Sequence, residues 1–186
     1  MSKEKIKEVA VKHYNEFGYK GTKLSQIAEE VGIRKQSLAY HFPSKQSLFK
    51  EVYKEAVEDE IQFVQKYFKQ NAEKSVEQQL YQFLTEHKER FITNPSTRFM
   101  LMIPLLVPDE LYEDIVGKPY IYIDTLTAAL ETCFTKQTFR KSTKECALAF
   151  VTVLDGLDIQ LVYEDSERYD LLQNIIWDIF WTGIKR

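Results

Sequence analysis

Glycine and proline are scarce in this sequence, with six and five residues among 186. Turns between β-strands draw heavily on these two residue types, so their scarcity argues against a sheet protein with many hairpins. It favours long helices joined by few turns. Hydrophobic residues make up 44% of the chain and charged residues 28%, as in an ordinary globular domain. We therefore predict an all-α protein of about nine helices.

Features that anchor or export a protein are also missing. The longest apolar run, FMLMIPLLV at 99–107, is far shorter than the roughly 20 residues that cross a bilayer. The first residues, MSKEKIKEVAVKHY, are charged and amphipathic, unlike a secretory signal. Cys133 and Cys146 have neither metal-ligand spacing nor the number needed for a disulfide framework. These absences predict a cytoplasmic protein with no metal site and no membrane partner.

Catalytic patterns are absent from the sequence as well. It has no HExxH motif, no glycine-rich phosphate loop and no Ser/His/Asp or Cys/His pattern. The three histidines, His13, His41 and His87, lie on different predicted helices without ligand spacing. Charged residues at 88–90 follow His87, which predicts a surface position for it. We expect neither an enzymatic activity nor a cofactor.

The charge is distributed unevenly along the chain. Residues 1–50 contain ten Lys or Arg against five acidic residues, whereas 51–186 contain 15 basic and 23 acidic residues. The total, −3, hides this contrast. A basic segment attached to an acidic body indicates that only the first part faces a polyanion.

Breaks in the helical pattern divide the basic segment into three predicted helices. Apolar residues recur at helical spacing over 3–17, and Gly18 should end that helix. Thr22 is the expected N-cap of a second short helix, which Gly32 ends. A third helix is expected over 35–42. The second and third helices, joined by a four-residue turn, form a helix-turn-helix arrangement.

The third helix carries side chains suited to DNA, and in this motif it lies in the major groove. Arg34 and Lys35 can contact phosphates or guanine, and Gln36 can pair with adenine. Leu38 and Phe42 should turn inward and anchor the helix. The alternative is that the polar face is merely solvated. The predicted DNA-binding residues are Thr22, Lys23, Arg34, Lys35, Gln36, Ser37, Tyr40, His41 and Lys45.

Helical signals continue through the rest of the chain. Residues 44–71 contain no glycine or proline, which predicts one long connecting helix capped by Ser44. Capping boxes are expected at 75–78 and at 142–145. The region 96–118 should be irregular because prolines and a glycine interrupt it. Further helices are expected at 120–136, 142–163 and 169–184.

A string of fixed spacings runs through the basic segment. It comprises Ile6 and Ala10, FGY at 17–19, Thr22, IAEEVGI at 27–33, Leu38, HF at 41–42, SK at 44–45 and Leu48. With these residues, 6–53 resemble the DNA-binding domain of the TetR family of bacterial transcriptional regulators. Three positions depart from the family's pattern. Arg34 replaces a small capping residue, Gln36 stands where a small residue is common, and Ala39 replaces a tyrosine that commonly contacts the DNA backbone.

The resemblance implies a ligand-responsive regulator of transcription, expected to be a repressor. Such a protein binds a palindromic operator in double-stranded DNA as a homodimer and is released by a small apolar effector. A helix-turn-helix domain is implied at 1–46, followed by a helical effector-binding and dimerisation domain at 47–186. The alternative is a helical protein-interaction or small-molecule-binding module that does not bind DNA.

Two residue sets in the second domain are candidates for these functions. Aromatic and methionine residues near helix breaks predict an effector pocket, although such residues more often form plain core. This set is Phe63, Tyr67, Phe83, Phe99, Met102, Tyr120 and Phe134. The last two helices are apolar on more than one face, which predicts a dimer interface unless all of these residues pack internally. This set is Phe150, Leu154, Leu157, Leu161, Ile175, Ile176, Ile179 and Phe180.

Overall fold

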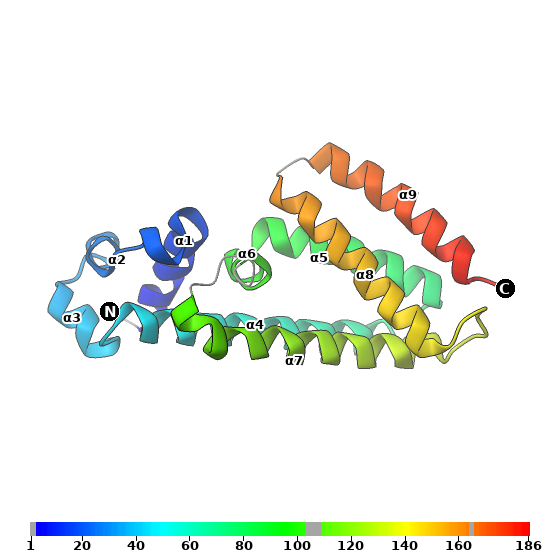
Figure 1. Cartoon of the computed structure of the whole chain (residues 1–186), viewed down its shortest axis with the longest axis horizontal. Coiled ribbons are helices and arrows are strands. Elements are labelled where there is room, and N and C mark those ends of the chain that lie inside the picture. Colours follow the sequence, from blue (N-terminus) through cyan, green and yellow to red (C-terminus); the bar gives the residue numbers. More distant parts are fainter. Residues whose placement is uncertain (1–2, 103–108, 164–165) are drawn as a thin grey trace. The chain divides into compact units, whose positions relative to one another are not determined.

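The computed structural model describes residues 3–102, 109–163 and 166–186, which form nine α-helices and no β-sheet (Figure 1). The helices are α1 (Lys3–Gly21), α2 (Leu24–Val31), α3 (Lys35–His41), α4 (Lys45–Gln70), α5 (Val76–Thr93), α6 (Pro95–Met102), α7 (Asp109–Phe134), α8 (Thr143–Val162) and α9 (Ser166–Ile184). The all-α prediction is confirmed. Within these residues, no helix is long and apolar enough to cross a membrane.

Two compact units make up the chain, each built from two separate stretches. Unit 1 comprises residues 1–59 and 94–120, and unit 2 comprises 60–93 and 121–186. Helices α4 and α7 each contribute residues to both units. The domain boundary expected at residue 46 stays a prediction, because these units are defined by contacts rather than by chain order.

Unit 1 packs α1, α2 and α3 around the first part of α4, with α6 against α1. Apolar side chains at helical spacing form its core: Ile6, Val9, Ala10, Tyr14, Ile27, Val31, Leu38, Phe42, Leu48 and Phe49 are buried. A second layer of aromatic rings joins α1, α4 and α6. Phe99 lies with its ring centre 5.7 Å from Tyr14 and 5.4 Å from Phe49. The Asn15 side chain donates a hydrogen bond of 2.8 Å to the carbonyl of Pro95.

Most of the predicted helix ends are confirmed. The Ser44 side chain accepts a hydrogen bond from the Ser47 amide at 3.0 Å. The boxes that begin at Ser75 and Ser142 are both formed. The N-cap of α2, however, is Lys23 without a side-chain bond, so the prediction for Thr22 is wrong. Its hydroxyl turns back to α1 and donates to the carbonyls of His13 and Gly18.

The prediction of irregular structure over 96–118 is also wrong where the structure describes that region. Helix α7 begins at Asp109 and continues through Gly117 and Pro119. An internal proline costs about 3 kcal/mol because it removes one backbone hydrogen bond and crowds the preceding turn. Leu111 and Ile115, one turn apart, are fully buried and offset this cost by apolar burial. Pro104 and Pro108 lie outside the described residues.

In unit 2, α8 and α9 pack side by side, and both contact α5 (Figure 1). The rings of Phe83, Phe150 and Phe180 follow one another from α5 through α8 to α9, with centre separations of 6.3 and 5.8 Å. Leu154, Leu157 and Leu161 are buried along α8. The apolar core of unit 2 therefore lies among these helices, together with the later turns of α4 and α7.

Candidate nucleic-acid interface and ligand-binding core

The turn before α3 decides where that helix points. Gly32 has φ 77° and ψ 33°, a left-handed conformation that glycine adopts without strain. This turn returns the chain on itself, and the Ile33 amide donates to the Ala28 carbonyl at 2.9 Å. Leu38 and Phe42 then bury their side chains completely and hold α3 from behind. The inward roles predicted for both residues are confirmed.

The outer face of α3 is polar and open to solvent. Arg34, Lys35, Gln36, Ser37, Tyr40 and His41 are all exposed, as is Lys23 at the start of α2. Tyr40 is the most prominent, with 86% of its surface accessible, and its ring lies 5.4 Å from that of His41. Seven of the nine predicted DNA-binding residues therefore share an accessible surface, which we call the α3 surface. Ala39, the departure from the expected tyrosine, is exposed beside them.

Thr22 and Lys45 have different surroundings. Thr22 is buried, and its hydroxyl is used inside unit 1. The Nζ atom of Lys45 donates to the carbonyls of Tyr19 at 2.7 Å and Thr22 at 3.1 Å, and it lies over the Tyr19 ring. Lys45 thereby satisfies carbonyls in the α1–α2 connection, as a cation near a helix C-terminus commonly does. This geometry makes both residues supports for the α3 surface.

A third support joins α1 to α2. The Nε2 atom of His13 lies 2.8 Å from the Oε2 atom of Glu30, and the histidine ring is buried. The link crosses the packing between the first two helices, where Ile27 and Ala28 are also buried. It restrains α2, which precedes the turn that aims α3.

The residues predicted for an effector pocket are divided between the two units. Phe63, Tyr67, Phe83 and Phe134 lie in unit 2, whereas Phe99, Met102 and Tyr120 lie in unit 1. Phe99 is fully buried in the aromatic layer, and Tyr120 is 61% exposed. In unit 2, the rings of Phe63 and Phe83 stack with their centres 5.8 Å apart. We therefore restrict the proposed effector site to the four residues that lie in unit 2.

A buried polar cluster lies beside these rings, and the sequence did not reveal it. We name it the His87 cluster: Glu60 of α4, His87 and Arg90 of α5, Tyr122 of α7 and Asp158 of α8. His87 has no accessible surface, so its predicted surface position is wrong. Helical periodicity could have predicted that His87 is buried, because it falls on the same face of α5 as the buried Leu80, Phe83, Leu84 and Phe91. Glu60 likewise lies between the buried Ala56 and Val64 on α4.

Ion pairs organise the His87 cluster. Nε2 of His87 lies 2.8 Å from Oδ1 of Asp158, and Nη2 of Arg90 lies 2.5 Å from Oε1 of Glu60. The Arg90 guanidinium also lies over the Phe63 ring at 4.3 Å. Burial, the largest single effect, would lower the pKa of His87, but the Asp158 and Glu60 carboxylates together outweigh it and raise that pKa above its usual value. Burial, with nearby carboxylates, raises the pKa of Tyr122 well above its usual value.

The last two helices separate the predicted dimer residues into two groups. Five of the residues predicted for the dimer interface are instead buried within the chain's own core: Phe150, Leu154, Leu157, Leu161 and Phe180. The residues still available for a dimer interface are therefore fewer than predicted. Ile175 and Ile179 are exposed, and Ile176 is half-buried. Other exposed apolar side chains are Leu148, Ile159 and Leu171 on the same two helices, and Tyr163 directly after α8. Sequence periodicity alone did not distinguish the inward from the outward stripe.

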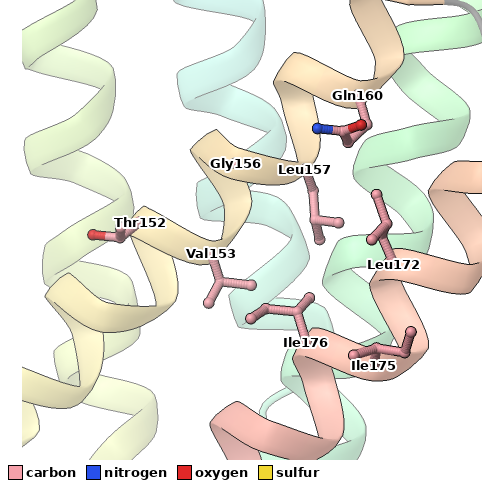
Figure 2. A pocket seen from close by; sticks show the side chains of 8 residues that line it. All are labelled: Thr152, Val153, Gly156, Leu157, Gln160, Leu172, Ile175 and Ile176. Atoms are coloured by element: carbon pink, nitrogen blue, oxygen red, sulfur yellow. The ribbon is translucent and has the colours of Figure 1, made fainter.

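Between these helices lies an open groove of about 340 Å³ (Figure 2). Its walls are mostly apolar, and Figure 2 shows side chains of α8 and α9 lining it. The lining residues are Thr152, Val153, Gly156, Leu157, Gln160, Leu172, Ile175 and Ile176. Gly156 leaves one wall without a side chain, and apart from its chain neighbours and its own helix backbone no described atom lies within 4 Å of the position that a Cβ atom would occupy. The groove can therefore accept a side chain from outside the chain.

Comparison with known proteins agrees with this arrangement. Residues 6–52 match the family described as bacterial regulatory proteins, tetR family. The chain is 36% identical over 120 residues to IcaR of Staphylococcus aureus strain Newman, the negative transcriptional regulator of the biofilm operon icaADBC. This match covers 62% of the chain and spans 60% of the length of that relative.

Solved structures show the same fold over nearly the whole chain. FadR of Bacillus subtilis, a transcriptional regulator solved with stearoyl-CoA, gives a TM-score of 0.74 at 18% identity, covering 98% of this chain and 100% of that one. A TetR-family transcriptional regulator from Agrobacterium tumefaciens gives 0.75 at 16% identity, covering 98% and 97%. All three of these similar proteins are named as regulators of transcription.

Proposed function

We propose that this chain, whose residues 6–52 match the tetR family, acts as a member of that family: a ligand-responsive transcriptional repressor that binds a palindromic operator as a homodimer. The repressing direction is supported by the resemblance to a negative transcriptional regulator. The operator and the effector are the two partners that the proposal requires.

The α3 surface is the observation on which the proposal depends. Besides Lys23 before α2, it presents two cations, two amide or hydroxyl groups and two aromatic rings along α3, which follows the left-handed turn at Gly32. Cations contact phosphates without regard to sequence, whereas the Gln36 amide can make a bidentate pair with adenine. A helix held from behind by Leu38 and Phe42 can present these groups in a groove without losing its own packing.

Two copies are needed because one helix of this length reads only a half-site. In dimeric helix-turn-helix proteins, the half-sites are spaced by one helical turn of DNA, about 34–36 Å, or a multiple of it. The exposed apolar stripe on α8 and α9, with the groove beside it, is the surface we assign to the second copy. An isologous contact there would bury the same residues on both copies.

Effector binding in unit 2 would act by changing the population of dimers with the correct half-site spacing. A ligand can shift such an equilibrium only if it binds one state more tightly than the other. Helices α4 and α7 each contribute residues to both units, so they are the continuous elements through which the two events can be coupled.

An electrophoretic mobility shift on the DNA upstream of the chain's own gene tests the proposal. We expect a sequence-selective shift that unlabelled promoter DNA competes away and that unrelated DNA of equal length does not. The logarithm of the binding constant should fall steeply and linearly with the logarithm of salt concentration. A chain that shifts no promoter selectively is better explained as a helical interaction module.

A further inference from the structure

Outside its Glu60–Arg90 ion pair, the His87 cluster holds two buried polar atoms that have no hydrogen-bond partner among the described residues. They are Nδ1 of His87 and the hydroxyl oxygen of Tyr122. Both side chains are at least nine-tenths buried, His87 with no accessible surface and Tyr122 with 5%. More than nine-tenths of buried polar groups in proteins are hydrogen-bonded, and an unsatisfied one destabilises the fold by about 1–3 kcal/mol. Two such atoms in one cluster call for a partner.

The two atoms belong to one site. The charges of Asp158, Glu60 and Arg90 act on both His87 and Tyr122, which places the two side chains among the same three groups. The Nε2 atom of His87 is used by Asp158, and Glu60 is ion-paired with Arg90. What the site offers to a ligand is therefore the Nδ1 atom and the phenol hydroxyl.

We propose that the effector is a predominantly apolar small molecule carrying one neutral oxygen group, a hydroxyl or a carbonyl, which bonds to His87 Nδ1 and the Tyr122 hydroxyl. The inference rests on the proposed function in that it identifies the chemistry of the effector site. The rings of Phe83 and Phe63 provide the apolar side of the site. Phe83 stacks on His87 with ring centres 6.0 Å apart, and Phe63 lies against Arg90.

The charge balance of the cluster selects a neutral ligand group. When His87 is protonated, two cations face two carboxylates, Glu60 and Asp158, and the cluster is neutral. Asp155, one turn before Asp158, adds a further acidic group at its edge. A ligand carboxylate would bring an unpaired negative charge into this interior, where an unpaired charge is strongly unfavourable.

Either protonation state of His87 can use such an oxygen. Protonated His87 donates from Nδ1, as does the Tyr122 hydroxyl, and a carbonyl or hydroxyl oxygen has lone pairs for both. If His87 is neutral with Nε2–H directed at Asp158, Nδ1 becomes an acceptor, and a ligand hydroxyl can donate to it. A saturated hydrocarbon of the same shape can do neither.

Isothermal titration of the full chain with matched probes tests the inference. Suitable probes are straight-chain 1-alcohols, 2-ketones, carboxylates and alkanes of equal length, compared over a series of lengths. We expect alcohols or ketones to bind about tenfold more tightly than alkanes and carboxylates of the same length, equal to about 1.4 kcal/mol. Equal affinity for the alkane, preference for the carboxylate, or no binding of any alcohol or ketone would overturn it; the last result would assign the two atoms to bound water.

Tyr122→Phe should abolish the preference for the oxygen-bearing probes while the chain remains at least as stable, because it removes an unsatisfied hydroxyl. Tyr53→Phe is the matched control, a buried tyrosine of unit 1 whose hydroxyl donates to Met100, and it should keep the preference. In spectra of ¹⁵N-histidine-labelled protein, the Nδ1 resonance of His87 should move with the alcohol and not with the alkane. An unchanged preference in Tyr122→Phe would overturn the inference.

The mobility-shift experiment separates this inference from the proposed function. If the chain discriminates the probes but binds no promoter, the inference about ligand chemistry stands and the proposed regulatory function is wrong. If the chain binds its promoter selectively but does not discriminate the probes, the proposed regulatory function stands and the inference about ligand chemistry is wrong.

Discussion

The Nζ atom of Lys45 lies 2.7 Å from the carbonyl oxygen of Tyr19 and 4.3 Å from the centre of the Tyr19 ring. Lys45 is the first residue of α4, and Tyr19 lies near the end of α1. The bond therefore ties the connecting helix to the base of the helix-turn-helix. From the sequence, the same lysine was expected to contact DNA phosphate. The two roles predict different behaviour when the lysine is replaced.

Lys45→Met should lower the free energy of unfolding by about 1–2 kcal/mol, because two carbonyls in a half-buried position lose a charged donor. Urea denaturation of the free protein measures this loss. Lys35→Met is the control, since Lys35 is exposed on the α3 surface and its replacement should change stability by less than about 0.5 kcal/mol. If Lys45→Met were as stable as the parent and bound DNA with a smaller salt slope, Lys45 would be a phosphate contact instead.

Gln36 and Lys35 should have separable effects on DNA binding. Gln36→Ala should relax preference at one base pair of each half-site by about 1–3 kcal/mol, because a bidentate amide pair is lost. Lys35→Met should weaken all sequences alike and reduce the salt slope by about one. Selection from a random-sequence library, followed by titration at several salt concentrations, measures both. Uniform weakening by Gln36→Ala would show that this side chain does not read a base.

The exposed stripe on α8 and α9 should be needed for dimerisation. Ile175→Glu with Ile179→Glu places two carboxylates where we expect the second copy, and it should yield a monomer in sedimentation velocity at concentrations where the parent is a dimer. Burial of two isoleucines contributes about 3–6 kcal/mol, enough to raise the dimer dissociation constant more than a hundredfold. Ile92→Glu, an equally exposed site on α5, serves as the control. A dimeric double variant would place the interface elsewhere.

Stability should depend on pH through His87. Its pKa is raised in the folded chain relative to its usual value of 6.5, because the Asp158 and Glu60 carboxylates together outweigh the large opposing effect of burial. The protonated form is thus favoured by folding, so this contribution is fully present below the unfolded pKa. It is lost as pH rises through the folded pKa.

Urea denaturation between about pH 6 and about pH 8.5 should therefore show stability falling over that interval for the parent. His87→Gln should remove much of the slope, whereas His13→Gln provides a comparison in which the His87–Asp158 pair remains. The same slope in His87→Gln as in the parent would contradict the assignment.

Patterns that depend on neighbours along the chain were predicted correctly. The capping boxes at Ser75 and Ser142, the end of α2 at Gly32 and the long α4 are all local features of sequence. The inward anchors Leu38 and Phe42 also followed from helical spacing. Each of these is decided by residues within a few positions of one another, and the backbone geometry of a helix or turn carries the information directly.

Predictions that required knowledge of distant neighbours were less successful. A helix was expected to begin only at residue 120, but α7 continues through Pro119. Leu111 and Ile115 are buried before the proline, and Leu126 and Leu130 are buried after it. Charged sequence neighbours suggested that His87 is exposed, whereas its place on the stripe of α5 puts it in the interior. Thr22 was expected to cap the helix that follows it, yet its hydroxyl bonds to the helix before it.

The sequence by itself determined an all-α chain, a helix-turn-helix near its start and the polar residues on the outer face of α3. These follow from local periodicity, a glycine turn and the order of residue types along one helix. Only the tertiary structure decided that Lys45 supports this motif from within, which apolar stripe of α8 and α9 remains outside, and that His87 and Tyr122 share a buried cluster. The reason is physical: which partner satisfies a polar atom, and which face is buried, depend on helices that are distant in the sequence and adjacent in space.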